Sequence, residues 1–137
     1  MNTALTVSFG DIREKLRSAK SSLTMVFVVD LSGSMLYNLE AIREALLKLH
    51  GDAYRYRDRV GIVALKGLGA TVVQHPITNL RVAASKFAGM HVSGFTPLAA
   101  GMYKAWEVLK EAKRRDPAMV PVMIIITDGS ANVPLLR

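Results

Sequence analysis

The chain has 137 residues and no cysteine, half of its residues are hydrophobic, and its formal net charge at pH 7 is +7. This length suits one domain with a buried core, and the composition excludes a disordered chain, a disulfide framework and thiolate metal sites. No apolar run is long enough for a membrane span and the first ten residues do not resemble a signal peptide, so we expect a cytoplasmic protein without membrane contact.

Basic residues gather at Arg13–Lys20 and Lys110–Arg115. Neither cluster has interleaved aromatic residues or a nucleic-acid reading motif, so we expect no nucleic-acid partner. A solvated helix face accounts for both clusters, and an acidic protein partner is the functional alternative.

The first half of the chain predicts a helix, a strand and a second helix. Residues 11–20 have amphipathic helical spacing, and we assign 1–22 to a basic N-terminal extension and 23–137 to the main domain. The unbroken apolar run Met25–Val29 is typical of a strand buried on both faces. The helix that follows has inward residues at helical spacing: Leu39, Ile42, Leu46, Leu49 and Ala53.

The second half predicts a hairpin, two helices and a last strand. The hairpin joins 59–66 to 70–74 through a turn that contains glycine, which makes the second strand antiparallel at an edge. Thr78 or Asn79 caps a helix that ends by residue 89. The remaining elements are a long helix that begins after Pro97 and ends near Arg115, with Leu98, Met102, Ala105, Leu109 and Ala112 inward, and a buried strand at 121–127.

This order of elements predicts an α/β fold. We expect a Rossmann-like, doubly wound, mostly parallel sheet flanked by helices, with one antiparallel edge strand. Ligands of such sheets bind beyond the carboxyl ends of the strands, so candidate functional residues are those that follow the strands.

Short oxygen-bearing side chains follow the first strand at a spacing of two. Asp30, Ser32 and Ser34 form a hard ligand set suited to Mg²⁺, Mn²⁺ or Ca²⁺. Turn formation by Asp30 and helix capping by Ser34 explain the same residues without a metal. Asp128 follows the last strand and Thr96 precedes the long helix, so five oxygen side chains come to one edge, which capping alone does not require.

These five residues, in DLSGSM, GFTPL and TDG, resemble the metal-ion-dependent adhesion site of von Willebrand factor A domains, also called integrin I-like domains. The resemblance implies a bound Mg²⁺ or Mn²⁺ whose shell is completed by a carboxylate of a partner protein. The implied metal ligands are Asp30, Ser32, Ser34, Thr96 and Asp128, and the implied partner-binding rim is Gly33, Met35, Phe95 and Gly129.

A closer resemblance is to the C-terminal domain of the magnesium-chelatase D subunit. It covers nearly the whole chain and is carried by DIREKLRSAK, FVVDLSGSM, DAYRYRDRVGIVALKG, GFTPLAAG and TDGSAN. Phe95 stands where a glycine is usual and Ser130 where a basic residue is common, and neither change removes a ligand.

The resemblance implies a Mg²⁺-dependent protein–protein interaction module without catalytic activity of its own. Its parent would be an ATP-dependent chelatase that inserts a metal into a tetrapyrrole, and its metal would grip an acidic side chain of the ATPase subunit. The family's sheet continues beyond Asn132, so we expect the chain to be a C-terminally truncated fragment whose 121–127 strand is an exposed edge that favours self-association.

Other functions remain open from the sequence. A von Willebrand factor A module could serve a different ATPase complex. A divalent-metal-dependent phosphohydrolase of the haloacid-dehalogenase type needs a second acid where Ser32 stands, and a serine hydrolase needs a G-x-S-x-G frame that Ser34 lacks. An extracellular adhesion domain shares the metal site, but the absence of a signal and of cysteines argues against it.

Overall fold

The computed structural model describes residues 22–30, 39–41, 43–48, 56–66, 69–87 and 98–126, so the predicted helix at 11–20 lies outside the described residues. Residues 39–41 and 43–48 are helical. The other elements are strands β1 (Leu23–Val29), β2 (Arg59–Lys66), β3 (Gly69–Ile77) and β4 (Val120–Ile126) and helices α3 (Leu80–Phe87) and α4 (Leu98–Arg115).

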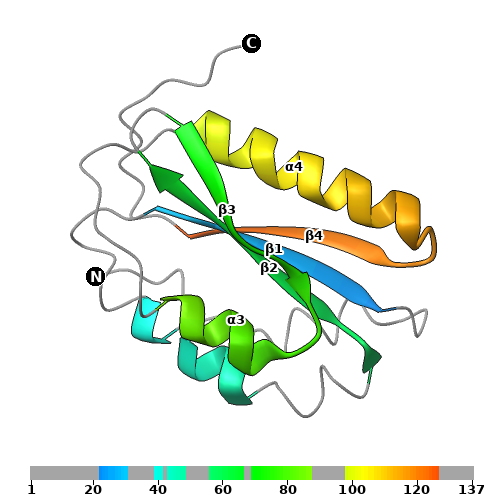
Figure 1. Ribbon diagram of the computed structural model, residues 1–137, viewed down its shortest axis with the longest axis horizontal. Coiled ribbons are helices and arrows are strands. Elements are labelled where there is room, and N and C mark those ends of the chain that lie inside the picture. Colours follow the sequence, from blue (N-terminus) through cyan, green and yellow to red (C-terminus); the bar gives the residue numbers. More distant parts are fainter. Residues whose placement is uncertain are drawn as a thin grey trace.

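The described strands form one sheet in the order β3-β2-β1-β4 (Figure 1). β1 is parallel to both β2 and β4, and β3 is antiparallel to β2 at an edge. The predicted α/β fold with a mostly parallel sheet and one antiparallel edge strand is therefore confirmed. β4 is the other edge among the described strands, and self-association through it stays a prediction. No helix in the described ranges is long and apolar enough to cross a membrane.

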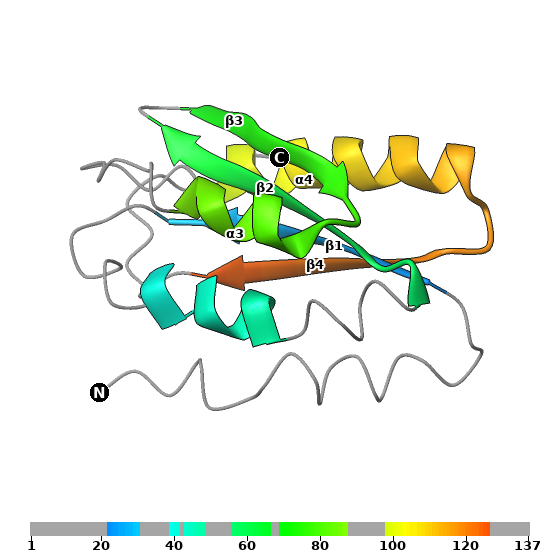
Figure 2. The ribbon, with the colours of Figure 1, turned by 60° about the horizontal axis from the view of Figure 1, so that its bottom comes forward.

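Every residue of β1 is buried because helices cover both faces of the sheet. α4 lies on one face, and α3 lies with the helical residues 39–41 and 43–48 on the other (Figures 1 and 2). Side chains of a strand alternate between the two faces, so an unbroken apolar run satisfies both layers at once.

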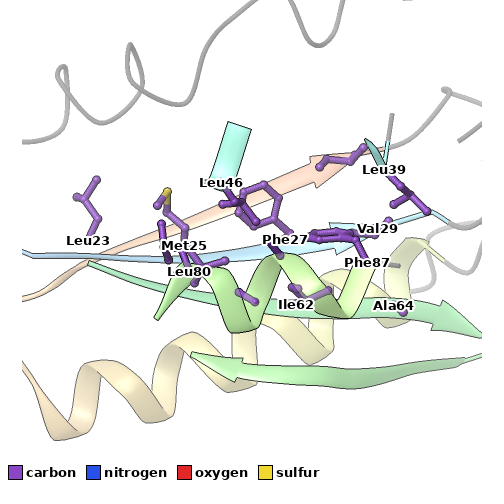
Figure 3. Packing of buried hydrophobic residues seen from close by; sticks show 14 residues of the cluster. Leu23, Met25, Phe27, Val29, Leu39, Leu46, Ile62, Ala64, Leu80 and Phe87 are labelled. Atoms are coloured by element: carbon purple, nitrogen blue, oxygen red, sulfur yellow. The ribbon is translucent and has the colours of Figure 1, made fainter. Parts of the chain in front are cut away.

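The two layers contain separate apolar clusters. Phe27 packs edge-on against Phe87 of α3, with ring centroids 6.4 Å apart, in the layer that also contains Met25 and Leu46 (Figure 3). The opposite layer holds the buried residues that face α4: Val26, Val28, Val63, Leu65, Ala105 and Leu109.

Asn79, rather than Thr78, caps α3. Its side-chain Oδ1 accepts a hydrogen bond from the backbone N–H of Arg81 at 3.1 Å, and its carbonyl oxygen accepts from Val82 at 3.1 Å. An asparagine oxygen at this position satisfies a backbone donor that the helix itself leaves unpaired.

β3 is longer than its composition predicts, since it continues through Pro76 to Ile77. The pairing with β2 shifts register twice, between Val60 and Ile62 and between Ile62 and Val63, which places extra residues on β3. Such bulges accept a proline that a regular ladder would exclude. Gly61 contributes as well, because a Cβ atom there would lie 3.2 Å from the Pro76 ring.

Asp58 anchors the amino end of β1. Its Oδ1 accepts a hydrogen bond from the backbone N–H of Leu23 at 2.9 Å, and the residue is fully buried. The carbonyl oxygen of Ser22 accepts from the N–H of Val120 at 2.9 Å. Side-chain and backbone contacts together thus fix where β1 begins relative to β2 and β4.

Replacing Asp58 by alanine should lower the free energy of unfolding by about 1–3 kcal/mol, because a buried backbone donor loses its acceptor. Urea denaturation measures this change. Asp58→Asn keeps an acceptor oxygen and should lose less; equal losses in the two variants would contradict a role for this hydrogen bond.

Candidate metal site

Asp30 is the first residue after β1 and is fully buried. Its backbone N–H donates to the carbonyl oxygen of Ile126, the last residue of β4, at 2.9 Å. β1 and β4 therefore end at the same level. Asp128 is two positions beyond Ile126 in the sequence, so the two predicted aspartates follow neighbouring strand ends.

α4 begins at the same edge of the sheet. Figure 1 shows the first turn of α4 on the side where β1, β2 and β4 end. Leu98, the first residue of the helix, packs with the apolar cluster that contains Val28. Thr96, which lies outside the described residues, is two positions before Leu98 in the sequence, so a third predicted ligand precedes the end of α4 that lies at this edge.

Asp30 is the one predicted ligand that the structure describes. Its burial at the carboxyl edge agrees with the placement predicted from the sequence. The other predicted ligands and the predicted rim lie outside the described residues, and their geometry stays a prediction: Ser32, Ser34, Thr96 and Asp128, and Gly33, Met35, Phe95 and Gly129.

The carboxylate of Asp30, the one described ligand, is an oxygen donor of the kind that hard cations take. Burial makes a charged carboxylate such as Asp30 costly unless a cation or hydrogen bonds compensate it. Within the described ranges, no three His, Cys, Asp or Glu side chains form a cluster that could hold a metal ion. The remaining ligands of a metal beside Asp30 would therefore come from outside the described ranges, where the predicted serine, threonine and aspartate ligands lie, and such oxygen ligands suit Mg²⁺ or Mn²⁺.

Gly101 is a positioning residue that the sequence reasoning missed. A Cβ atom there would lie 2.3 Å from Leu65 Cδ2 and 2.7 Å from Val28 Cγ1, closer than real contacts allow. The glycine lets the first turns of α4 approach the ends of β1 and β2. The sequence contains a signal for this role: Gly101 is three, four and eight residues from the inward Leu98, Ala105 and Leu109. A glycine on the inner face of a helix indicates close packing.

His75 is the one histidine in the described ranges. It lies two residues before Ile77, which pairs with Val60 near the amino end of β2. That is the edge opposite Asp30, so His75 is badly placed to act as a base for a nucleophile near Ser34. His50 and His91 lie outside the described residues.

Residues 25–130 match the family model described as von Willebrand factor type A domain. Among curated proteins, the chain is 35% identical over 132 residues to the magnesium-chelatase 60 kDa subunit of Rhodobacter capsulatus, which covers 96% of this chain and 23% of that protein. It is 32% identical over 133 residues to the magnesium-chelatase 67 kDa subunit of Chlorobaculum parvum, covering 96% of this chain and 21% of that protein.

An uncharacterized protein of Mycobacterium tuberculosis is equally similar, with 34% identity over 124 residues that cover 89% of this chain and 20% of that protein. The chain thus spans about a fifth of the length of these relatives. Among solved structures, three N-terminal domains of the type V pili tip protein Mfa5 from Porphyromonas gingivalis align with a TM-score of 0.66 at 16% identity, covering 81% of this chain and 20% of that chain. This last likeness concerns the fold alone.

Proposed function

The chain belongs to the von Willebrand factor type A family, and we propose that it is a Mg²⁺-dependent protein–protein interaction module of an ATP-dependent chelatase, similar to the magnesium-chelatase D subunit. The observation that carries the proposal is the shared edge at which the buried Asp30 follows β1, β4 ends beside it and α4 begins. The identity of 32–35% with magnesium-chelatase subunits over 96% of the chain supports the choice of complex.

In this proposal the metal, Mg²⁺ or Mn²⁺, supplies an electrophilic position that accepts a carboxylate. Asp30 and Asp128 contribute the negative charge of the site, and the three hydroxyl ligands contribute neutral oxygens: Ser32, Ser34 and Thr96. The chain itself performs no catalytic step. Its residues hold the ion, and the burial of Asp30 excludes water from that side of the metal site.

The proposed partner presents an Asp or Glu side chain, and we assign it to the ATPase subunit of the chelatase. The net charge of +7 attracts an acidic partner and speeds encounter at low ionic strength. The residues that would surround the contact are those of the predicted rim: Gly33, Met35, Phe95 and Gly129.

A second candidate is a von Willebrand factor A module that serves another ATPase complex. The observation that favours it is the 34% identity to the uncharacterized mycobacterial protein, as high as the identity to the chelatase subunits. Both candidates use the same metal site and differ only in the ATPase that supplies the carboxylate.

Retention of the chelatase ATPase subunit by the immobilised protein should require divalent metal. EDTA should release the ATPase and added Mg²⁺ should restore it, because the ion bridges the two proteins. Ser32→Ala should weaken retention about tenfold or more. Ser85→Ala is the matched control, because Ser85 is exposed on α3 and its hydroxyl donates to the carbonyl oxygen of Val82 within the helix.

Equal retention with and without EDTA would show that the metal does not bridge the proteins. Metal-dependent retention of a different ATPase, with none of the chelatase ATPase, would favour the second candidate.

A further inference from the structure

A cavity of about 570 Å³, wide open to solvent, lies between the part of α4 from Lys104 to Arg115 and the bulged end of β3. Its apolar part is formed by Val72, Val108 and Ala112. Arg59 and His75 also line it, together with charged residues of α4. The cavity is at the amino edge of the parallel strands, which is opposite to the edge that carries Asp30.

The part of β3 that lines this cavity contains its two bulges. One of them sets two residues, His75 and Pro76, opposite Gly61, whose missing side chain leaves room for the proline ring. Bulges commonly redirect side chains beside binding sites. On the facing side, α4 contributes Ala112, a small side chain, where a larger one would fill the space.

The acidic residues that line the cavity form ion pairs with residues of α4. Glu111 is paired with Arg114 at 3.3 Å and with Arg115 at 3.5 Å, and Glu107 lies 3.8 Å from Lys104. Both carboxylates thus have cationic partners on their own helix. Within the part of the chain that the structure describes, Arg59 and His75 form no ion pair. Among the described residues, the guanidinium of Arg59 thus has no carboxylate partner that an added anion would have to displace.

We propose that this cavity binds a small organic carboxylate with an apolar body. The body would lie on the valine and alanine side chains, and the carboxylate would take two parallel hydrogen bonds from the planar guanidinium of Arg59. The volume is within the range of small-molecule sites, which combine an apolar lining with a few polar groups that fix orientation. The site is independent of the metal edge.

The test is a titration of ¹⁵N-labelled protein with 2-naphthoate, followed by NMR, with the uncharged 2-naphthalenemethanol as the matched ligand. We expect saturable shifts at the amides of Val72, Val108 and Ala112, with 2-naphthoate bound about fivefold more tightly than the alcohol. Arg59→Gln should remove this preference. Arg81→Gln, an exposed arginine of α3, should preserve it.

Asp30→Asn and EDTA should leave naphthoate binding unchanged, so failure of the metal site and failure of this site are distinguishable. Absence of saturable shifts at the three amides would overturn the proposal. Equal loss of preference in Arg59→Gln and Arg81→Gln would overturn it as well, since it would indicate general attraction to a basic protein. Binding of an acidic peptide in place of naphthoate would also overturn it and would assign the cavity to a different class of ligand.

Discussion

Asp30→Asn should reduce the affinity of the protein for Mg²⁺ about tenfold or more while the fold is retained. Asparagine has nearly the shape of aspartate and keeps an acceptor oxygen, but it lacks the negative charge. In a site with three neutral hydroxyls, removal of one of two carboxylates takes away half of the formal charge that balances the ion. Isothermal calorimetry with Mg²⁺, and with Mn²⁺ in a parallel series, measures the loss.

Thermal unfolding distinguishes this role from a purely structural one. A ligand that binds the native state raises the free energy of unfolding with the logarithm of the ligand concentration. Mg²⁺ should therefore stabilise the unsubstituted protein and not Asp30→Asn. In EDTA the two proteins should differ little in stability, because asparagine keeps the shape and one acceptor oxygen of the side chain and neither protein then holds the metal. A loss of stability equal in EDTA and in Mg²⁺ would identify Asp30 as a structural residue.

Asp116→Asn is the matched control. Asp116 is a half-buried aspartate just after α4, at the end of the helix remote from Asp30, and its N–H donates to the carbonyl oxygen of Ala112 at 3.0 Å. Its replacement should leave the response to Mg²⁺ unchanged. An identical drop in affinity in both variants would mean that Mg²⁺ binding reflects overall charge and not a site at the carboxyl edge.

The sheet could be predicted because its strands are defined by local patterns. The apolar run of β1 requires cover on both faces, and the glycine-containing turn after Lys66 requires an antiparallel neighbour. The end of β3 could not be predicted from the same patterns. Pro76 indicates the end of a strand when it is considered alone, and only the register shifts against β2 explain why the strand continues to Ile77.

The residues at the two ends of β1 also differ in whether their roles could be predicted from sequence. Asp30 could be placed from sequence because it directly follows a buried strand, and strand ends of this fold meet at one edge. Asp58 could not, since its partner Leu23 is 35 residues away and nothing local distinguishes it from a turn-forming aspartate. Residues whose roles come from tertiary contacts need the packed structure to be recognised.

Replacement of Gly101 by alanine changes the free energy of unfolding through two opposed terms. Glycine to alanine within a helix gains about 1 kcal/mol of helix propensity. Overpacking a well-packed core costs about 1–3 kcal/mol. The new Cβ atom would lie 2.3 Å from Leu65 Cδ2 and 2.7 Å from Val28 Cγ1, and both of those side chains are fully buried with little space to move. We therefore expect overpacking to dominate.

Gly101→Ala should thus lower the free energy of unfolding by about 1 kcal/mol, and Gly101→Val by more, because valine carries two further methyl groups on the crowded Cβ atom. Gly69→Ala is the control, since a Cβ atom there meets nothing within 4 Å and its effect should stay within about 0.5 kcal/mol. Urea denaturation gives these values. A stabilised Gly101→Ala protein would show that helix propensity outweighs the contacts.

The same variant tests whether the packing of α4 supports the proposed metal site. The alanine side chain of Gly101→Ala fits only if the first turns of α4 move away from Val28 and Leu65. Thr96 is two residues before the first residue of that helix in the sequence. A shift of a few tenths of an ångström in a segment that carries a ligand weakens the binding of Mg²⁺, because this ion needs near-ideal octahedral geometry. Mg²⁺ affinity should therefore fall in folded Gly101→Ala and stay constant in Gly69→Ala. Reduced stability with unchanged Mg²⁺ affinity would restrict Gly101 to a packing role and would separate the position of α4 from that of the metal.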